Sequence, residues 1–492
     1  MARKTIIRTL FTLLLAFSSA ANGAISGRGE LVSATSVRAA PGVIFEQQIE
    51  SGDAPLILSL LKIDLKGKGV RVAAGQANGL VSLKAPDEGR QTVSEIALNE
   101  KAVAAINADF FPYTGDPLGL EIRNGELLSE SMDYRVCMGI SKGRVKFAVL
   151  TTIGSWSSKS MEGRLQGINR LPGASEVTLL TPAFNCETPL PREMDLIPLT
   201  GLNLPVKVSK EIAGVAEERL SLRTGDRLSQ CDKNCAYLAI GSKSNTTLRN
   251  LASGEKISIL FDLTPTGDPP EIGKYASASP AIGESHSIVW NDVQEAVSGG
   301  PWLVKEGKLF IDGEAEGMNR LSFVEMRHPR TAVGVTSNRQ LLLVTADGRS
   351  KWSRGASLQE MAEIMLRLGA VNAINLDGGG STTMVVNNQV INSPSDGRER
   401  PVANSLLVFT ELRKDKKLLE TFAGERIVRQ GVSVSLDPDL SSSERKSLVW
   451  GTEDGSGFVS QTGVFHCDKP GSCKVRAVSA HRSFTFAIKV SP

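Results

Sequence analysis

The stretch 374–386, INLDGGGSTTMVV, places one carboxylate, three glycines and three hydroxyl groups between two apolar runs. Consecutive glycines let backbone N–H groups converge on an anion because no Cβ intervenes, and hydroxyl groups add further donors. A carboxylate would repel an anion bound directly against it. The pattern therefore suits a substrate with a phosphate at one end and a neutral reacting carbon at the other. A strand-ending turn with solvated hydroxyls is the alternative. The polar positions are Asp377, Gly378, Gly379, Gly380, Ser381, Thr382 and Thr383.

A second segment, RHPRTAVGV at 327–335, places basic side chains just before an apolar strand. Arg330 is a candidate phosphate partner because the guanidinium fork binds two oxygens at once. His328 is a candidate acid or base, and we include it among the substrate-binding residues. A solvated basic turn is the alternative for both side chains.

A third segment, 107–125, carries carboxylates among aromatic residues. Aromatic rings suit sugar binding because the C–H face of a sugar packs on a ring, but they suit an ordinary core equally well. Asp109 is a candidate catalytic carboxylate, and Asn107 lies on the same face of the strand, since residues two apart share a face. The residues concerned are Asp109, Asp116, Glu121, Phe110, Phe111 and Tyr113.

Several common chemistries are missing from the sequence. It contains no G-x-S-x-G elbow, no Walker loop and no H-E-x-x-H pair, and it has four histidines in all. A net charge of +3 is small for 492 residues, so a broad nucleic-acid-binding surface is not expected. No cofactor is required by the pattern, although Asp109 and Asp377 at paired strand ends could hold Ca²⁺ through oxygen ligands.

Two helix–strand units are expected to position these side chains. Thr92 with Glu95, and Ser357 with Glu360, have the spacing of capping boxes and predict a helix after each. The second helix has one apolar face, and Gly369 is placed to cap its C-terminus. That face comprises Leu358, Met361, Ile364, Met365 and Leu368.

The strands that follow the two helices resemble each other. AVAAINAD at 102–109 and AVNAINLD at 370–377 match at six of eight positions. An internal duplication would present the ends of two like strands to one cleft. Chance similarity between two apolar strands is the alternative.

The chain divides into four predicted parts. Residues 1–21 combine basic residues, a short apolar run and small residues, which is typical of a secretory signal, so the protein is expected to be secreted or periplasmic, with no membrane span after cleavage. Residues 22–54 are expected to be an irregular linker or N-terminal extension. Residues 55–411 predict an α+β domain with a mixed, mostly antiparallel sheet and a few helices, to which the long stretch 154–270 is assigned. After the charged segment 412–417, residues 418–492 predict a small immunoglobulin-like β-sandwich, whose role is spacing or attachment.

Six cysteines in an exported chain suggest disulfide bonds. Cys231 with Cys235, and Cys467 with Cys473, could each close a small loop. Cys137 and Cys186 would then pair with each other or stay free. No cysteine pair has histidines at the spacing of a zinc site.

Taken in order, these segments resemble the phosphodiester glycosidase family. The specific part is LDGGGSTTM, with PRTAVG before it and VANSLLV after it, and the resemblance extends from about 56 to 409. By resemblance, a site assignment passes to Asn107, Arg330, Asp377, Gly378, Gly379, Gly380, Ser381 and Asn404. Asp109 departs from the family, which commonly has Gly there, and Glu121 falls at a position that the family pattern does not fix.

The resemblance implies hydrolysis of a sugar linked through its anomeric carbon to a phosphodiester. A phosphate leaving group is already anionic, so it needs charge stabilisation more than protonation, which Arg330 and the glycine backbone could provide. Asp377 would then act at the anomeric carbon. The expected partner is a carbohydrate phosphodiester from a glycan, cell wall or exopolysaccharide. The alternatives are a non-catalytic protein that binds a cell-envelope polymer and a phosphodiesterase that breaks the P–O bond.

Overall fold

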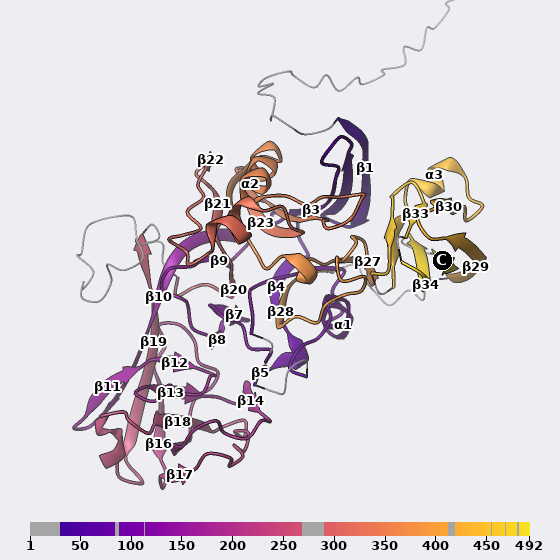
Figure 1. Cartoon of the computed structure of the whole chain (residues 1–492). Coiled ribbons are helices and arrows are strands. Elements are labelled where there is room, and N and C mark those ends of the chain that lie inside the picture. The colour runs from indigo at the N-terminus through magenta and orange to yellow at the C-terminus, as the bar shows by residue number, and fades with distance from the viewer. Residues whose placement is uncertain are drawn as a thin grey trace, which may run out of the picture.

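The computed structural model describes residues 30–83, 88–112, 114–267, 290–411, 419–453, 455–467, 469–479 and 482–492. The predicted signal at 1–21, the charged segment at 412–417 and Tyr113 lie outside these ranges. The described chain is mostly β-sheet with few helices, which confirms the general prediction of a mainly antiparallel architecture with some helix. Figure 1 shows a central body, a projecting lobe of strands and a C-terminal module in yellow.

Two sheets face each other in the central body. The first sheet has eight strands, in the order β1 (Leu31–Ala40), β2 (Val43–Glu50), β3 (Leu56–Asp64), β24 (Gln340–Ala346), β23 (Arg330–Thr336), β25 (Ala370–Asn375), β21 (Trp302–Lys305) and β22 (Lys308–Leu309). The second has nine, in the order β29 (Leu419–Arg429), β35 (Arg482–Ser491), β34 (Gly471–Val478), β31 (Val449–Thr452), β27 (Gln389–Val390), β26 (Met384–Val386), β6 (Ala104–Asn107), β28 (Asn404–Thr410) and β4 (Val70–Gln76).

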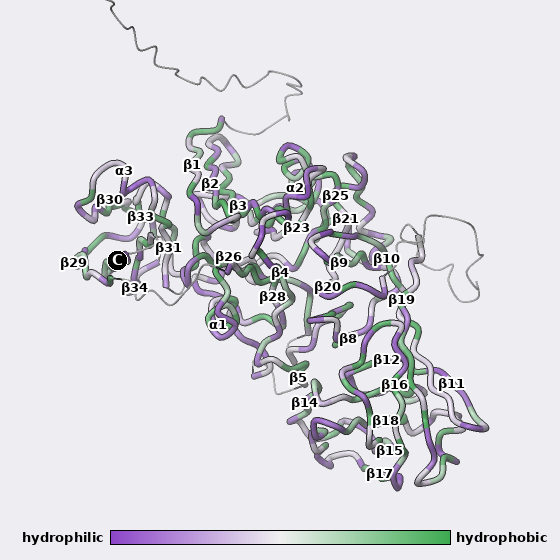
Figure 2. Tube along the Cα trace, turned by 180° about the vertical axis from the view of Figure 1, so that it is seen from behind, coloured by the Kyte–Doolittle hydropathy of each residue, from purple (hydrophilic) through white to green (hydrophobic). Residues whose placement is uncertain are grey.

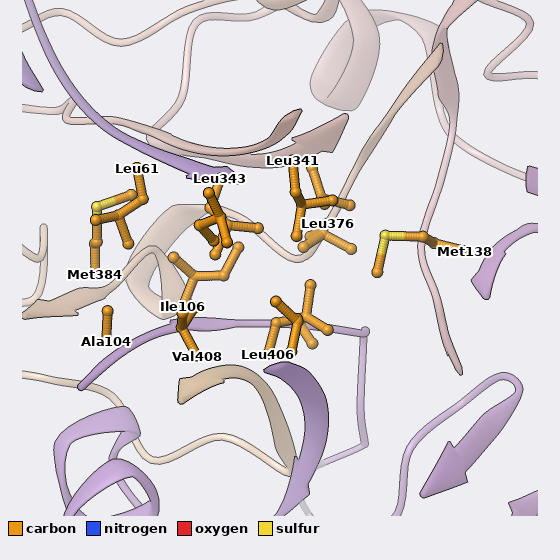
Figure 3. Close-up of a cluster of buried hydrophobic side chains, with 14 of the residues drawn as sticks. Leu61, Ala104, Ile106, Met138, Leu341, Leu343, Leu376, Met384, Leu406 and Val408 are labelled. Atoms are coloured by element: carbon orange, nitrogen blue, oxygen red, sulfur yellow. The ribbon is translucent and has the colours of Figure 1, made fainter. Parts of the chain in front are cut away.

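The largest hydrophobic core lies between these two sheets. Leu61, Leu341 and Leu343 of the first sheet meet Ile106 and the other apolar side chains of the second, as Figure 3 shows. Alternate residues of a strand point to opposite faces, so each sheet also has an outer apolar face that must be covered. Helix α2 (Leu358–Arg367) covers the outer face of the first sheet, and α1 (Val93–Asn99) covers that of the second.

Both predicted capping boxes are formed. The Thr92 side chain accepts from the Glu95 N–H at the start of α1, and Ser357 does the same with Glu360 at α2. Gly369 follows α2 with φ +88°, a conformation that favours glycine at a helix C-terminus. The two similar strands, β6 and β25, lie in different sheets and both contribute to the central core. The internal duplication itself stays a hypothesis.

One expectation about the N-terminal part is wrong. Residues 31–50, expected to be irregular, form the antiparallel hairpin β1–β2, and β2 pairs along its length with β3. Phe45, which is fully buried, anchors this hairpin in the central core. The alternation of polar and apolar side chains in an edge hairpin leaves little net hydrophobicity in the sequence, so the pattern resembles that of a loop.

A third sheet of thirteen strands forms the projecting lobe and its root. The strands along its main path are β12 (Gly167–Ile168), β13 (Val177–Leu180), β18 (Ala236–Gly241), β15 (Met194–Thr200), β16 (Ile212–Ala216), β19 (Lys256–Gly267), β10 (Arg144–Ser158), β9 (Val136–Ser141), β20 (Glu295–Ser298), β7 (Glu121–Arg123) and β8 (Glu126–Ser129). β11 (Glu162–Leu165) and β17 (Leu220–Leu222) pair at its sides. The described part of 154–270 is thus regular sheet joined to the body through the long strands β10 and β19, with a core of its own.

The C-terminal module has a separate core between two small sheets. The first is the part of the nine-stranded second sheet made by β29, β35, β34 and β31. The other is formed by β30 (Val434–Ser435), β33 (Val464–His466) and β32 (Phe458–Val459), with α3 (Ser442–Arg445) beside them. Seen from behind in Figure 2, hydrophobic and hydrophilic stretches alternate along the strands of the module and of the lobe. The immunoglobulin-like topology and the domain boundaries stay predictions.

All six cysteines are present as thiols, so the two predicted small disulfide loops are not formed. The sulfur of Cys231 lies 3.5 Å from the Leu180 carbonyl oxygen, and that of Cys467 lies 3.1 Å from the carbonyl oxygen of Lys469. Cys137 and Cys186 do not pair with each other either, because they belong to different hydrophobic clusters. Among the described helices, none is long and apolar enough to cross a bilayer.

Candidate active site

The site forms where the chain leaves β6 and β25 at the rim of the central core. The Asp377 N–H donates to the Ala108 carbonyl at 2.9 Å, and the Asn107 amide donates to the Asp377 carbonyl at 2.6 Å. These bonds tie the two strand ends together although they belong to different sheets. They bring Asp109 and Asp377 near each other, as the similarity of the two strands predicts.

Asn107 and Asn404, which were expected to bind substrate, form hydrogen bonds inside the protein. Both are fully buried. The Asn107 side-chain oxygen accepts from the Thr331 hydroxyl and the Thr383 N–H, at 2.8 and 3.1 Å. Asn404 accepts from the Asp109 N–H at 2.9 Å and donates to a carboxylate oxygen of Glu121 at 2.8 Å. Their role is to position the two aspartates, because their polar atoms are already engaged by the protein.

Asp109 is enclosed and held by the backbone. It is 1% exposed, and its two carboxylate oxygens accept from the N–H groups of Phe110 and Gly119 at 2.8 and 2.9 Å. Burial raises the pKa of Asp109 to about 6, and the Asp377 carboxylate raises it further, whereas Arg135 and the two N–H groups lower it. Because it is enclosed, Asp109 is better placed to act on Asp377 through its charge than to contact a substrate.

Asp377 is more exposed to solvent than Asp109. The residue keeps some solvent exposure, although its carboxyl group is surrounded by protein atoms. Burial raises the pKa of Asp377 to about 6, and the Ser381 hydroxyl, the Gly378 N–H and the guanidinium groups of Arg400 and Arg135 lower it. A carboxylate with a pKa near neutrality, at an accessible position, is suited to act as a base or nucleophile.

Most N–H groups of the glycine loop are engaged within the protein. Those of Gly378, Gly379, Ser381 and Thr382 donate to the Asp377 carboxylate and to the carbonyls of Pro329, Gly378 and Gly379. The predicted binding of a phosphate by this loop stays a prediction. Ser381 and Thr382 are also buried, at 0% and 1% exposure.

The glycines allow neighbouring groups to lie close to the backbone of the loop. A Cβ on Gly379 would lie 3.1 Å from the guanidinium of Arg349, and one on Gly380 would lie 2.1 Å from that of Arg400. A Cβ on Gly378 would meet the Pro329 carbonyl at 2.8 Å. Glycine is needed here because any side chain would push the two arginines away from Asp377.

Arg330 binds the protein backbone in this structure, and its predicted contact with substrate stays a prediction. It is 1% exposed, and its guanidinium donates to the backbone carbonyls of Phe323, Met326 and Ala356. The ring of Phe323 stacks 5.1 Å from it. Burial and, to a lesser extent, the nearby Arg349 charge lower the pKa of Arg330 to about 10. Arg330 thus holds the π-helical segment η3 (Arg320–Glu325) in place.

This difference gives a testable prediction for Arg330→Lys. A lysine cannot reach three carbonyls in the same fork geometry, so buried acceptors would lose their donor at a cost of about 1–3 kcal/mol each. We expect a lower melting temperature with little change in the KM of the molecules that remain folded. A large rise in KM at unchanged thermal stability would instead indicate direct phosphate binding.

His328 also supports an arginine instead of acting as an acid or base. Its Nε2 donates to the Ser322 carbonyl at 2.9 Å, which leaves Nδ1 to accept from Arg349 at 3.2 Å. Burial lowers the pKa of His328, as do the charges of Arg330 and Arg349. The imidazole is therefore neutral at pH 7 and fixes the orientation of the Arg349 guanidinium.

Three arginines near Asp377 were not identified from the sequence. Arg349 and Arg400 lie against the glycine loop, and Arg400 forms an ion pair with Asp396 at 2.8 Å. Arg135 stacks 4.8 Å over the Phe110 ring, and within the described chain its Nε and Nη1 atoms are buried without a hydrogen-bond partner. An unpaired buried guanidinium beside two aspartates is a strong candidate for binding an anionic group.

Signals for these arginines in the sequence were weak. Arg400 lies in the polar loop 392–404, and Arg349 lies within the range from about 56 to 409 that resembles the family. Arg135 lies in the connection before β9, and no motif or spacing distinguishes it from a surface arginine.

Glu121 is the most strongly perturbed acid near the site. It is fully buried, and within the described residues one of its oxygens has no hydrogen-bond partner. Burial raises the pKa of Glu121 to about 8, while the amide of Asn404 lowers it and the carboxylates of Asp109 and Glu295 raise it. Glu121 is therefore protonated and neutral at pH 7.

The raised pKa predicts how Glu121→Gln changes stability. In the unfolded chain the carboxyl ionises near its ordinary value of 4.5, whereas in the folded protein it stays protonated up to about 8. Its contribution to stability is complete below pH 4.5 and is lost as the pH rises through 8, with a slope of up to about 1.4 kcal/mol per pH unit. Glu121→Gln should therefore match the wild type at pH 4.5 and be more stable at pH 8 in chemical denaturation. Parallel stability profiles for the two proteins would contradict this.

A Ca²⁺ site receives no support from the geometry. In the described part of the chain, no group of three or more His, Cys, Asp or Glu side chains is arranged to hold a metal ion. The Asp109 oxygens are also occupied by backbone N–H groups.

Comparison with known proteins shows what the site region is similar to. The sequence model of the phosphodiester glycosidase family matches residues 242–409, which include β23, α2, β25 and the glycine loop. This part of the chain resembles the phosphodiester glycosidases. Human N-acetylglucosamine-1-phosphodiester alpha-N-acetylglucosaminidase is 40% identical over 114 residues, which is 22% of each chain. The SPbeta prophage-derived uncharacterized protein YomE of Bacillus subtilis is 32% identical over 171 residues, or 34% of this chain and 25% of that one.

The fold also resembles a solved structure. A hypothetical protein from Synechocystis aligns with a TM-score of 0.62 and 20% identity, over 77% of this chain and 64% of that one, which shows a common fold. The chain spans about a quarter of the length of the curated relatives it matches. Asp377, Arg349 and Arg400 lie inside the region matched by the family, whereas Asp109 and Arg135 lie before it.

Proposed function

We propose that the protein is an exported hydrolase that cleaves the glycosyl C–O bond of a sugar-1-phosphodiester and releases free sugar. The proposal is supported above all by one arrangement, in which Asp377 feels the charges of Arg135 and Arg400 and precedes a glycine loop that Arg349 also contacts. A glycosyl phosphodiester offers a neutral anomeric carbon to the carboxylate and an anionic phosphate to the arginines. The substrate would be a phosphate-linked glycan or a component of the cell wall or exopolysaccharide.

The arrangement favours a particular division of labour. The departing phosphate carries its own negative charge, so arginines stabilise it without any proton transfer, which removes the need for a separate general acid. Asp377 then acts at the anomeric carbon, by activating water or by stabilising the positive charge of the transition state. Asp109 raises the basicity of Asp377 through like-charge repulsion, and the Phe110 ring fixes Arg135 from behind.

The direct experiment uses the purified full chain with aryl-linked and nucleotide-linked sugar phosphodiesters in water enriched in ¹⁸O. We expect free sugar that carries the label, because C–O cleavage transfers the water oxygen to the anomeric carbon. Label in the phosphate would mean that a phosphodiesterase breaks the P–O bond. Binding of several sugar phosphodiesters without release would favour a polymer-binding protein instead.

A further inference from the structure

The C-terminal module touches both loops that carry arginines to the site. One is loop 347–356, which follows β24 and holds Arg349. The other is loop 391–403, which lies between β27 and β28 and holds Arg400. A module that served only as a spacer would have no reason to contact either of them.

The contacts with loop 347–356 are aromatic. The Trp352 ring lies 4.4 Å from the imidazole of His466, at the end of β33, and His466 in turn stacks on Phe458 at 5.7 Å. Such ring pairs are worth about 0.5–1.5 kcal/mol beyond the area they bury. Trp352 is three residues from Arg349, so this contact restrains the loop close to the guanidinium.

Loop 391–403 is held from two sides. On the inner side, the Asn392 amide donates to the Thr382 carbonyl at 3.0 Å, and Ser393 donates its N–H to the buried carboxylate of Asp347. On the outer side, the module packs against it closely. A Cβ on Gly455 would lie 2.9 Å from the Pro394 ring, and one on Gly397 would lie 2.8 Å from the amine of Lys469.

The module itself is fixed to both central sheets. Thr452 of β31 pairs with Val390 of β27, which continues the second sheet into the module. The Gln461 N–H donates to the buried side chain of Gln47 in β2 of the first sheet, at 3.0 Å. Buried polar contacts of this kind fix a relative orientation because leaving them unpaired is costly.

We propose that the C-terminal module is a positioning element of the phosphate-binding face, which sets where Arg349 and Arg400 stand beside Asp377 by packing on their loops. The inference rests on the proposed function. Trp352 and His466 are positioning residues, because neither lies on the glycine loop but both restrain a loop that does reach it. Without the outer support, loop 391–403 would retain its inner anchors and lose a defined position for Arg400.

The test compares Trp352→Ala and His466→Ala with the wild-type full chain. The loss of about 0.5–1.5 kcal/mol of restraint should weaken binding of inorganic phosphate and raise KM by about threefold to tenfold, with kcat changed less. Amide hydrogen exchange in 347–356, the loop that the Trp352–His466 contact restrains, should become faster. His466→Phe and Trp352→Phe keep a ring at the contact and should restore slow exchange and phosphate binding.

A matched control removes a ring from inside the module. Phe486 stacks on Trp450 at 5.9 Å in the core of the module, away from both loops. Phe486→Leu should lower thermal stability while phosphate binding and exchange in 347–356 stay as in the wild type. If His466→Ala fails to fold, Trp352→Ala breaks the same contact from the catalytic side.

The outcomes separate this inference from the proposed function. Unchanged phosphate binding and unchanged exchange in both alanine variants would overturn the positioning role, even if the protein releases sugar. Faster exchange and weaker phosphate binding would support it, even if no sugar phosphodiester is cleaved. Equal effects from Phe486→Leu would show that general loosening of the module explains the result, and would also overturn the inference.

Discussion

Asp377→Asn is expected to lower kcat/KM for a sugar phosphodiester by about 10³-fold or more, since it removes the group that acts at the anomeric carbon. The fold should persist, because the asparagine oxygen can still accept from the Gly378 N–H at the position that the carboxylate occupies. Sugar release under initial-rate conditions measures the loss, and circular dichroism with thermal melting confirms folding. Near-normal turnover in a folded Asp377→Asn would remove Asp377 from the mechanism.

The pH profile gives the same prediction a second readout. Activity needs the ionised carboxylate of Asp377, whose pKa burial raises to about 6, so kcat/KM should fall as the pH drops below about 6. Because Asp109 is a close like charge, this acid limb belongs to the pair and not to one residue. Asp109→Asn removes that charge and should move the limb to lower pH.

Stability should follow the opposite course for these two acids. Their pKa values are raised from the ordinary 3.8 to about 6 in the folded protein, so the stability gained from the protonated forms is complete below 3.8 and is lost as the pH rises through 6. The two acids therefore contribute most to the stability of the fold at an acid pH, at which the enzyme is expected to be inactive. Two ionised carboxylates close together destabilise the fold by repulsion, and the surrounding arginines partly offset this.

Arg135→Gln is expected to lower kcat by about 10²–10³-fold, which is the usual effect of removing one donor that stabilises developing charge. The guanidinium has buried donors without partners in the described chain and lies beside both aspartates, so a phosphate oxygen would complete its hydrogen bonds. The same substitution removes a positive charge that lowers the pKa of Asp377. The acid limb of the pH profile should therefore shift upward as the rate falls.

The control for Arg135→Gln is Arg144→Gln at the exposed start of β10. It makes the same chemical change one hairpin away from the site and should leave both the rate and the acid limb unchanged. A normal kcat in Arg135→Gln would show that Arg135 does not stabilise the phosphate. An acid limb that does not move would show that its charge does not act on the pKa of Asp377.

The helix–strand units could be predicted because their signals are local. A capping box joins residues three positions apart, and the apolar face of α2 repeats with the helical period, so Thr92, Ser357 and Gly369 could be interpreted without any tertiary contact. The strand that delivers Asp377 and the glycines after it were identified in the same way. The hairpin β1–β2 was missed because an edge hairpin has only a short alternating pattern.

The roles of the polar residues were decided by tertiary structure. Arg330 and Arg135 are the same residue type, but the carbonyls of Phe323, Met326 and Ala356 accept from one guanidinium, while buried donors of the other have no partner among the described residues. Asn107 and Asn404 hold distant segments together because their amides bind side chains that are 224 and 283 residues away in the sequence.

The sequence by itself determined that an acid and a glycine run end a buried strand, and that a similar strand end exists elsewhere. It could not determine which cations meet that acid, because Arg135, Arg349 and Arg400 come from separate loops whose approach depends on packing. Only the tertiary structure shows that the glycines admit arginines to the side of Asp377, since a Cβ clash is a property of neighbours in space.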